Sequence, residues 1–158
     1  MSPVIQPTDI RRGTSADLPR IVALLSATGL PTADLPGIPH LDLWVMDLAG
    51  SVAGVIALER FGVEGLVRSL AVMPPYRNRG YGAQLVDRLE ADAVQEGVRH
   101  LVLLTETADA FFRKRGYSLV DRDSVSPAVK QSAEFRSLCP ASAICLSKSL
   151  SSASHVGL

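Results

Sequence analysis

The stretch that decides the fold covers residues 70–82 and reads Leu70-Ala71-Val72-Met73-Pro74-Pro75-Tyr76-Arg77-Asn78-Arg79-Gly80-Tyr81-Gly82. It lies between an apolar strand-like segment and a segment with apolar side chains at helical spacing. Gly80 and Gly82 lack a Cβ, so the backbone can turn tightly and present consecutive N–H groups where the helix begins. Arg77 and Arg79 add positive charge. The stretch therefore predicts a phosphate-binding loop.

Two other phosphate-binding loops fit less well. A Walker A loop needs a Lys-Ser/Thr pair after the glycines, and none follows Gly82, which disfavours a nucleotide triphosphatase. The dinucleotide fingerprint is closer, because Gly80-x-Gly82 opens a helix and Glu106 follows the next strand. However, Leu85 occupies the third glycine position, and seven residues with two prolines separate the strand from the turn.

Outward from this loop, the pattern predicts a largely antiparallel sheet. Strands at 41–48, 51–60 and 65–72 are joined by short turns, which is typical of an antiparallel meander. A helix that starts near Thr14 and ends at Gly29 precedes them, followed by a proline-rich loop. After the loop we expect a long helix up to Gly97 and then smaller elements. These are strands at 98–105, 117–120 and 142–147 and short helices at 108–115 and 126–138. The predicted fold class is α+β, or mixed α/β.

Composition predicts one soluble domain. The chain has 158 residues, of which 47% are hydrophobic, enough for one core. We expect a single domain over residues 1–150 and a flexible, Ser-rich tail over residues 151–158. Because 16 basic residues balance 16 acidic ones, no global charge recruits nucleic acid or an anionic membrane. The N-terminus has no signal-peptide pattern and no apolar run is long enough to span a bilayer, so we expect a cytoplasmic protein.

Cysteine and histidine do not predict a metal site. Cys139 and Cys145 form neither a CxxC pair nor a disulfide framework, and we interpret them as small core thiols. Whether either one meets a metalloid is left open. The three histidines have no ligand spacing.

Two motifs in order resemble one family. The Arg-x-x-Gly-x-Gly run from Arg77 to Gly82, preceded by a strand and a Pro-Tyr pair, closely resembles the acyl-CoA pyrophosphate loop of the GNAT N-acetyltransferase superfamily. About 30 residues later, Phe111 to Tyr117 looks like the second signature of that family, an aromatic helix end followed by Gly-aromatic. The resemblance implies a single GNAT domain, its central sheet flanked by helices, that transfers an acetyl group from acetyl-CoA to a primary amine.

Three further segments are similar to the subgroup associated with arsenic-resistance operons: residues 133–143, 66–72 and 103–105. Arsenite has no amine and cannot be N-acetylated. The resemblance therefore implies a small acceptor such as an amino-acid-like toxin or an organoarsenical amine.

The resemblance also implies a set of residues that bind acetyl-CoA. The backbone groups of Leu70, Ala71 and Val72 are expected to pair with the pantetheine arm as an added strand would. The pyrophosphate is expected to meet the loop residues Arg77, Asn78, Arg79, Gly80, Tyr81 and Gly82. Phe112 is expected to lie beside acetyl-CoA. It occupies the position where the family usually has a tyrosine that acts as the general acid.

Acetyl transfer needs a base, an oxyanion donor and a proton for the leaving thiolate. We interpret Glu59, near the end of the second meander strand, as the base, and the N–H of Val72 as the oxyanion donor. Phe112 has no proton to give, so water or the hydroxyl of Tyr76, Tyr81 or Tyr117 is expected to serve.

Three residues are expected to bind the acceptor: Arg60, Arg68 and Ser69. An arginine fork suits a carboxylate or an arsonate-like group. Simple surface charge is an equal alternative for either arginine.

Two other functions stay open, namely a sensor that binds acyl-CoA without turnover and an N-acetyltransferase that acts on a peptide or protein. The sequence also leaves a homodimer open.

Overall fold

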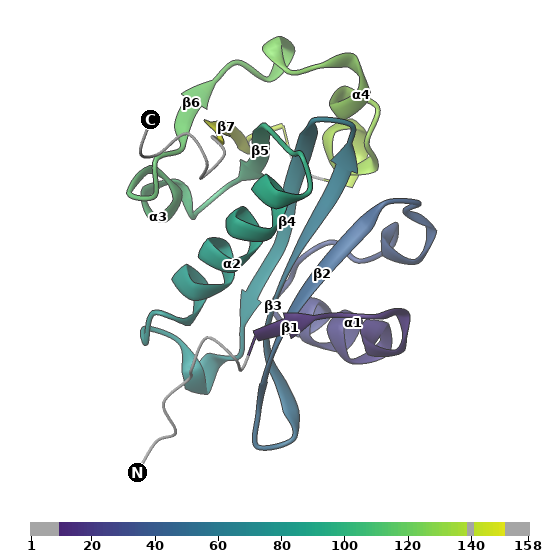
Figure 1. Cartoon of the computed structure of the whole chain (residues 1–158), viewed down its shortest axis with the longest axis vertical. Helices are drawn as coiled ribbons and strands as arrows, with labels where there is room; N and C mark the ends of the chain where they lie inside the picture. The colour runs from purple at the N-terminus through teal and green to yellow at the C-terminus, as the bar shows by residue number, and fades with distance from the viewer. Residues whose placement is uncertain (1–9, 139–140, 151–158) are drawn as a thin grey trace.

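The computed structural model describes residues 10–138 and 141–150. Its centre is a seven-stranded sheet in the order β1-β2-β3-β4-β5-β7-β6 (Figure 1). Within this sheet β4 and β5 pair in parallel and the other neighbours pair antiparallel, which confirms the predicted mixed α/β fold. The strands are β1 Ile10–Arg12, β2 Leu41–Leu48, β3 Ser51–Phe61, β4 Glu64–Val72, β5 His100–Thr105, β6 Ser118–Val120 and β7 Ile144–Ser149.

Helices cover both faces of the sheet (Figure 1). Short 3-10 turns and a π-helical turn complete the chain. The helices are α1 Leu18–Ala27, α2 Tyr81–Gln95, α3 Asp109–Arg113 and α4 Pro127–Lys130, and the π-helical turn is η6, Glu134–Leu138.

Strand alternation explains why two separate cores form. Ile56 and Leu58 of β3 point to one face, where they pack with the apolar stripe of α2 that includes Leu85 and Leu89. The neighbouring residues of β3, such as Val55, point to the other face and pack against α1. Each helix therefore buries its apolar side on a different face of one sheet.

The chain from 126 to 138 differs from the single helix that the sequence predicts. Helix α4 ends at Lys130, and the π-helical turn η6 begins four residues later. Ser132 separates the two, because its hydroxyl accepts a hydrogen bond from the N–H of Phe135 at 3.3 Å and so starts a new helical turn. The sequence also did not predict the three-residue strand β1, and it started β5 two residues too early.

Cys145 is buried and unpaired, as expected of a core thiol, and burial raises its pKa to about 11. Cys139 and the predicted tail at residues 151–158 lie outside the described residues. Within the described ranges, no helix has both the length and the apolar character needed to cross a membrane. The same ranges bring together no group of three or more His, Cys, Asp or Glu side chains suited to a metal ion.

Candidate active site

The site forms where β4 and β5 separate. These strands pair only from Glu64 to Leu66 of β4 and from His100 to Val102 of β5. Further along, β4 contains a β-bulge, because its register with β3 shifts by one residue and Ser69 has a φ of +62°. A positive φ is strained for serine, so the surrounding structure must hold it in place. The bulge turns β4 away from β5 and opens a gap in the sheet.

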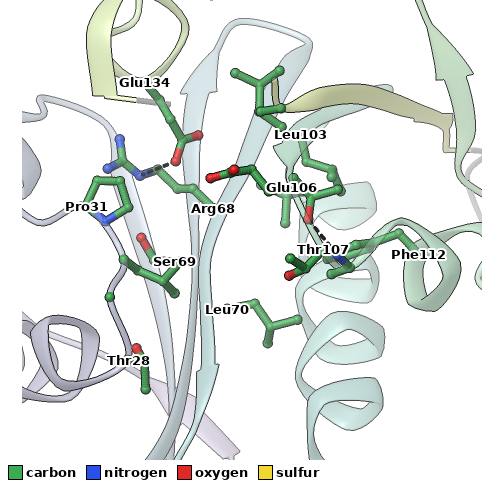
Figure 2. A pocket seen from close by; sticks show the side chains of 17 residues that line it. Thr28, Pro31, Arg68, Ser69, Leu70, Leu103, Glu106, Thr107, Phe112 and Glu134 are labelled. Carbon is green, nitrogen blue, oxygen red and sulfur yellow. Dashed lines mark hydrogen bonds and ion pairs between the residues drawn. The ribbon is translucent and has the colours of Figure 1, made fainter. Parts of the chain in front are cut away.

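A cavity of about 530 Å³ fills this gap. Ser69 and Leu70 form its floor on the β4 side, and Phe112 of α3 closes it on the other side (Figure 2). The lining residues are 28–31 from the loop after α1, 67–70 from β4, 103–108 from and after β5, and Phe112, Glu134 and Ala143. The cavity is large enough for a small molecule.

The edge of β4 beside the gap has backbone groups that do not pair with β3. The N–H of Met73 donates to the carbonyl of Ala53 at 2.8 Å, so the alternation of an antiparallel ladder turns the backbone groups of Val72 away from β3. The guanidinium Nε of Arg77 donates to the Val72 carbonyl at 2.9 Å, as this orientation requires. Leu70 shares the orientation of Val72. An extended ligand can therefore pair with β4 at Leu70 and Val72.

Ala71 does not share this orientation. It lies opposite Val55 in the register, and the alternation directs its backbone groups to β3. The prediction that the Ala71 backbone pairs with a pantetheine arm is therefore wrong, since its N–H and C=O already belong to the sheet.

The predicted phosphate-binding loop follows directly after this edge. Asn78 has a φ of +63° and Gly80 a φ of +81°, and Gly80 is the N-cap residue of α2. The first N–H groups of α2 have no partner within the helix, and the helix dipole favours an anion at this end. A Cβ built on Gly80 meets nothing within 4 Å, so the space beside the turn is open. Arg77 and Arg79 are exposed there.

Tyr81 and Gly82, the last two loop residues, have different surroundings. The side chain of Tyr81 is buried in the core beneath α2. Gly82 lies against the ring of Phe111, 3.7 Å from the position of a Cβ. Tyr81 and Gly82 can therefore contribute backbone N–H groups to the loop, whereas the tyrosine hydroxyl does not line the cavity.

None of the three candidate tyrosines lines the cavity. Tyr117 is buried, donates its hydroxyl to Glu90 at 2.9 Å, and has its pKa raised far above the ordinary value by burial and then by Glu90. Tyr76 packs against the α2 core. Phe112 itself is buried, in edge contact with Phe111 and Tyr117. Hydroxyls that do reach the cavity are those of threonine and serine, among them Thr105, which accepts from the N–H of Ala108 at 2.9 Å.

Arg68 is the centre of a buried ionic cluster. Its two terminal nitrogens donate to both carboxylate oxygens of Asp34 at 2.6 and 2.7 Å, and Nη1 also contacts Glu59 at 3.3 Å. Its Nε lies 3.9 Å from Glu134 of η6. The Arg68 side chain is 0% exposed. Although Arg68 lines the cavity, its guanidinium is enclosed by carboxylates, so no nitrogen is left exposed to an anion.

Glu59 lies beside the cavity rather than in its lining. Its side chain is buried on the α1 side of β3, where it accepts a hydrogen bond from Arg68. Burial raises the pKa of Glu59, and this effect exceeds the opposing influence of the Arg68 guanidinium. A carboxylate with a raised pKa is a stronger base than an exposed glutamate.

The structure does not bring Arg60 to the cavity. Adjacent residues of a strand point to opposite faces, so Arg60 lies on the α2 side of the sheet. There it forms ion pairs with Asp42 at 2.7 Å and with Glu96 at 3.3 Å. Of the three predicted acceptor-binding residues, only Arg68 and Ser69 reach the cavity lining.

The sequence did not predict three acidic residues as part of the site: Asp34, Glu106 and Glu134. Asp34 precedes the 3-10 turn η3, Leu35–Gly37, in the proline-rich loop. Glu134 lies in the π-helical turn, a rare element that is frequent at functional sites. Glu106 could have been recognised by its place directly after β5, where the sheet opens.

A helix N-terminus with open space beside it, a strand edge that does not pair with β3 and a cavity lie along β4. This arrangement is suited to a long phosphate-bearing ligand and a smaller molecule held end to end. A family model described as an acetyltransferase (GNAT) domain matches residues 39–119. This match spans just over half of the chain, so the chain belongs to the GNAT acetyltransferase family.

Curated relatives carry acetyltransferase names. The chain is 36% identical over 88 residues to an uncharacterized N-acetyltransferase of Chlorobaculum tepidum, CT2212, across 54% of this chain and 56% of that protein. It is 36% identical over 67 residues to the amino-acid acetyltransferase of Escherichia coli, across 42% of this chain and 15% of that protein. The matches thus span about half, or less, of these relatives.

Solved structures share the fold. N-acetylglutamate synthase of Neisseria gonorrhoeae, in complex with coenzyme A and N-acetyl-glutamate, superposes with a TM-score of 0.74 at 23% identity, over 90% of this chain and 35% of that chain. At this identity the likeness shows the GNAT fold.

Proposed function

We propose that this protein transfers the acetyl group of acetyl-CoA to the primary amine of a small molecule. The observation that carries the proposal is the alignment of three features along one side of β4. These are the loop at residues 77–82, the backbone groups of Leu70 and Val72 that point away from β3, and the cavity beyond them. When bound, acetyl-CoA supplies a thioester whose carbonyl carbon accepts the amine.

The chain's own groups take these roles in the proposal. The loop and the α2 N-terminus hold the pyrophosphate, and the β4 edge orients the pantetheine arm. The N–H of Val72 donates to the carbonyl oxygen as it becomes an oxyanion. Glu59 takes the proton from the amine through a water, since Glu59 does not line the cavity. As the C–N bond forms and the C–S bond breaks, water protonates the thiolate, because Phe112 cannot.

The acceptor class in the proposal is a small amine. The cavity, of about 530 Å³, suits such a molecule. An amino-acid-like toxin or an organoarsenical amine is the finer prediction from the sequence, and the names of the curated relatives suggest amino acids. A cytoplasmic location stays a prediction as well.

The test is a thiol-release assay with acetyl-CoA across a panel of small amines, with the product identified by mass. We expect amine-dependent release of coenzyme A and an N-acetylated product. A sensor without turnover, which the phenylalanine at position 112 favours, predicts a raised melting temperature with acetyl-CoA but no amine-dependent thiol. Acetylation of peptides alone would contradict the small-molecule assignment.

A further inference from the structure

The lining of the acceptor cavity has more acidic than basic side chains. Among the lining residues that the structure describes, Arg68 is the single basic side chain, while Glu106 and Glu134 are acidic. Figure 2 shows Glu134 and Glu106 approaching the space between β4 and β5 from opposite sides. The charge that a ligand meets in this cavity is therefore set by two carboxylates and by whatever part of Arg68 is available.

The Arg68 guanidinium is not exposed to the cavity, although its buried Nε has no hydrogen-bond partner among the described residues and only approaches Glu134. Both of its terminal nitrogens are bonded to Asp34, at 2.6 and 2.7 Å, and its side chain is 0% exposed. Glu59 and Glu134 approach the same guanidinium at 3.3 and 3.9 Å. Three carboxylates therefore surround this guanidinium, and Glu106 adds a further carboxylate to the cavity lining. A ligand carboxylate would meet repulsion from these groups and no exposed cation to offset it.

The positive charge of the site lies at the other end of β4. Arg77 and Arg79 are exposed beside the phosphate-binding loop, where the pyrophosphate would bind. The net charge of the whole chain is zero, with 16 basic and 16 acidic residues. The separation of positive from negative charge is therefore a local feature of this site. The loop at residues 77–82 therefore suits a phosphate, whereas the cavity suits a cation.

We propose that the acceptor is a primary amine that carries no carboxylate, and that a second ammonium group on it strengthens binding through Glu106 and Glu134. This inference rests on the proposed acetyl transfer and makes its acceptor class specific. It replaces the predicted arginine clamp for an anionic group and distinguishes this acceptor from a free amino acid.

Three amines of similar length test the proposal: 1,5-diaminopentane, pentylamine and 6-aminohexanoate. At saturating acetyl-CoA we expect kcat/KM to fall in that order, with the diamine at least tenfold above the aminohexanoate. Added salt should compress the difference. A kcat/KM for 6-aminohexanoate equal to or above that for pentylamine would overturn the proposal.

Two variants locate the effect. Glu106→Gln changes an exposed side chain and should lower the diamine-to-pentylamine ratio of kcat/KM at least threefold. Glu134→Gln should do the same, provided that its melting temperature shows a folded protein. Asp87→Asn removes an exposed charge on α2, outside the cavity, and is the matched control. An unchanged ratio in Glu106→Gln and in folded Glu134→Gln would remove both residues from the acceptor site.

The outcomes separate this inference from the function on which it rests. Turnover of all three amines with the carboxylate preferred would contradict the acidic acceptor site and leave acetyl transfer intact. Absence of thiol release with every amine, while acetyl-CoA still raises the melting temperature, would contradict the proposed function and this inference with it.

Discussion

At the scale of single residues, the buried cluster around Arg68 determines what Glu59 can do. Glu59 receives a hydrogen bond from a guanidinium that two other carboxylates also approach, and burial keeps its pKa above the ordinary value. Glu59 should therefore be protonated at low pH and active as a base once it ionises. Activity is expected to rise with pH through this raised pKa.

Glu59→Gln keeps the shape of the side chain and removes the proposed base. We expect kcat to fall on the order of 10²-fold, with little change in the affinity for acetyl-CoA. The limb of the pH–rate profile that rises with pH should disappear. Glu64→Gln, at the turn of the same β3–β4 hairpin and outside the cavity lining, is the control. An unchanged pH–rate profile in a folded Glu59→Gln variant would exclude Glu59 from the mechanism.

Arg68→Lys tests whether this guanidinium is structural. A lysine keeps the charge but cannot donate to both oxygens of Asp34, so we expect a loss of about 2–4 kcal/mol in the free energy of unfolding. Urea denaturation measures it. Any loss of kcat/KM should be equal for anionic and neutral amines. A stable variant with a selective rise in KM for anionic amines would instead restore the anion-clamp interpretation.

At the scale of elements, the turn from β4 into α2 is suited to bind the pyrophosphate because Gly80 adopts a positive φ beside open space. Gly80→Val places a branched side chain where the pyrophosphate would bind and also strains the backbone. We expect this variant to fold and to lose the rise in melting temperature that acetyl-CoA gives the parent protein.

Gly62→Val is the matched control for this prediction. Gly62 has a φ of +66° and equally open surroundings, but it lies in the turn between β3 and β4. Its valine variant should be destabilised by about 1–2 kcal/mol and still respond to acetyl-CoA. If both variants respond like the parent, residues 77–82 do not bind the pyrophosphate.

The start of α1 depends on Asp17. Its carboxylate accepts from Arg11 at 2.9 and 3.0 Å and from the N–H of Thr14 at 2.7 Å. The hydrogen bond from Arg11, followed by that from Thr14, holds the pKa of Asp17 well below its usual range. Asp17→Asn should therefore cost about 1–2 kcal/mol of unfolding free energy at pH 7.

The pH dependence of this loss follows from the direction of the shift. A lowered pKa in the folded state contributes stability that is present above the unfolded pKa of about 3.9 and is lost as pH falls below it. The difference between Asp17→Asn and the parent, measured in urea at pH 7 and pH 3, should shrink at pH 3. A difference that is equal at both values would show that the charge of Asp17 does not stabilise the helix start.

At the scale of the whole molecule, periodicity was sufficient for the antiparallel meander and for the long helix after it, because apolar residues recur at the strand or helix period in these segments. It did not predict β1 or the break between α4 and η6. The separation of β4 from β5 was not predictable. It depends on a serine with a positive φ at residue 69, a conformation that serine rarely adopts and that no sequence pattern marks.

The backbone of the candidate site could be predicted where it is local, as in the glycine turn at residues 77–82 that begins α2. The partners of individual side chains were harder to predict from the sequence. Strand alternation alone separates Glu59 from Arg60, and this rule would have placed Arg60 on the α2 face. By contrast, the contact of Arg68 with Asp34 spans 34 residues and depends on an irregular loop, so sequence spacing could not reveal it.

The central claim is that the loop, the strand edge and the cavity act together as one acetyl-transfer site. The most direct measurement is a mass balance, in which free coenzyme A and N-acetylated amine are quantified in the same reaction for the parent protein and for Gly80→Val. We expect one acetylated amine for each thiol released by the parent protein and neither product above background from the folded variant. Thiol release without acetylated amine, or equal product from both proteins, would contradict the claim.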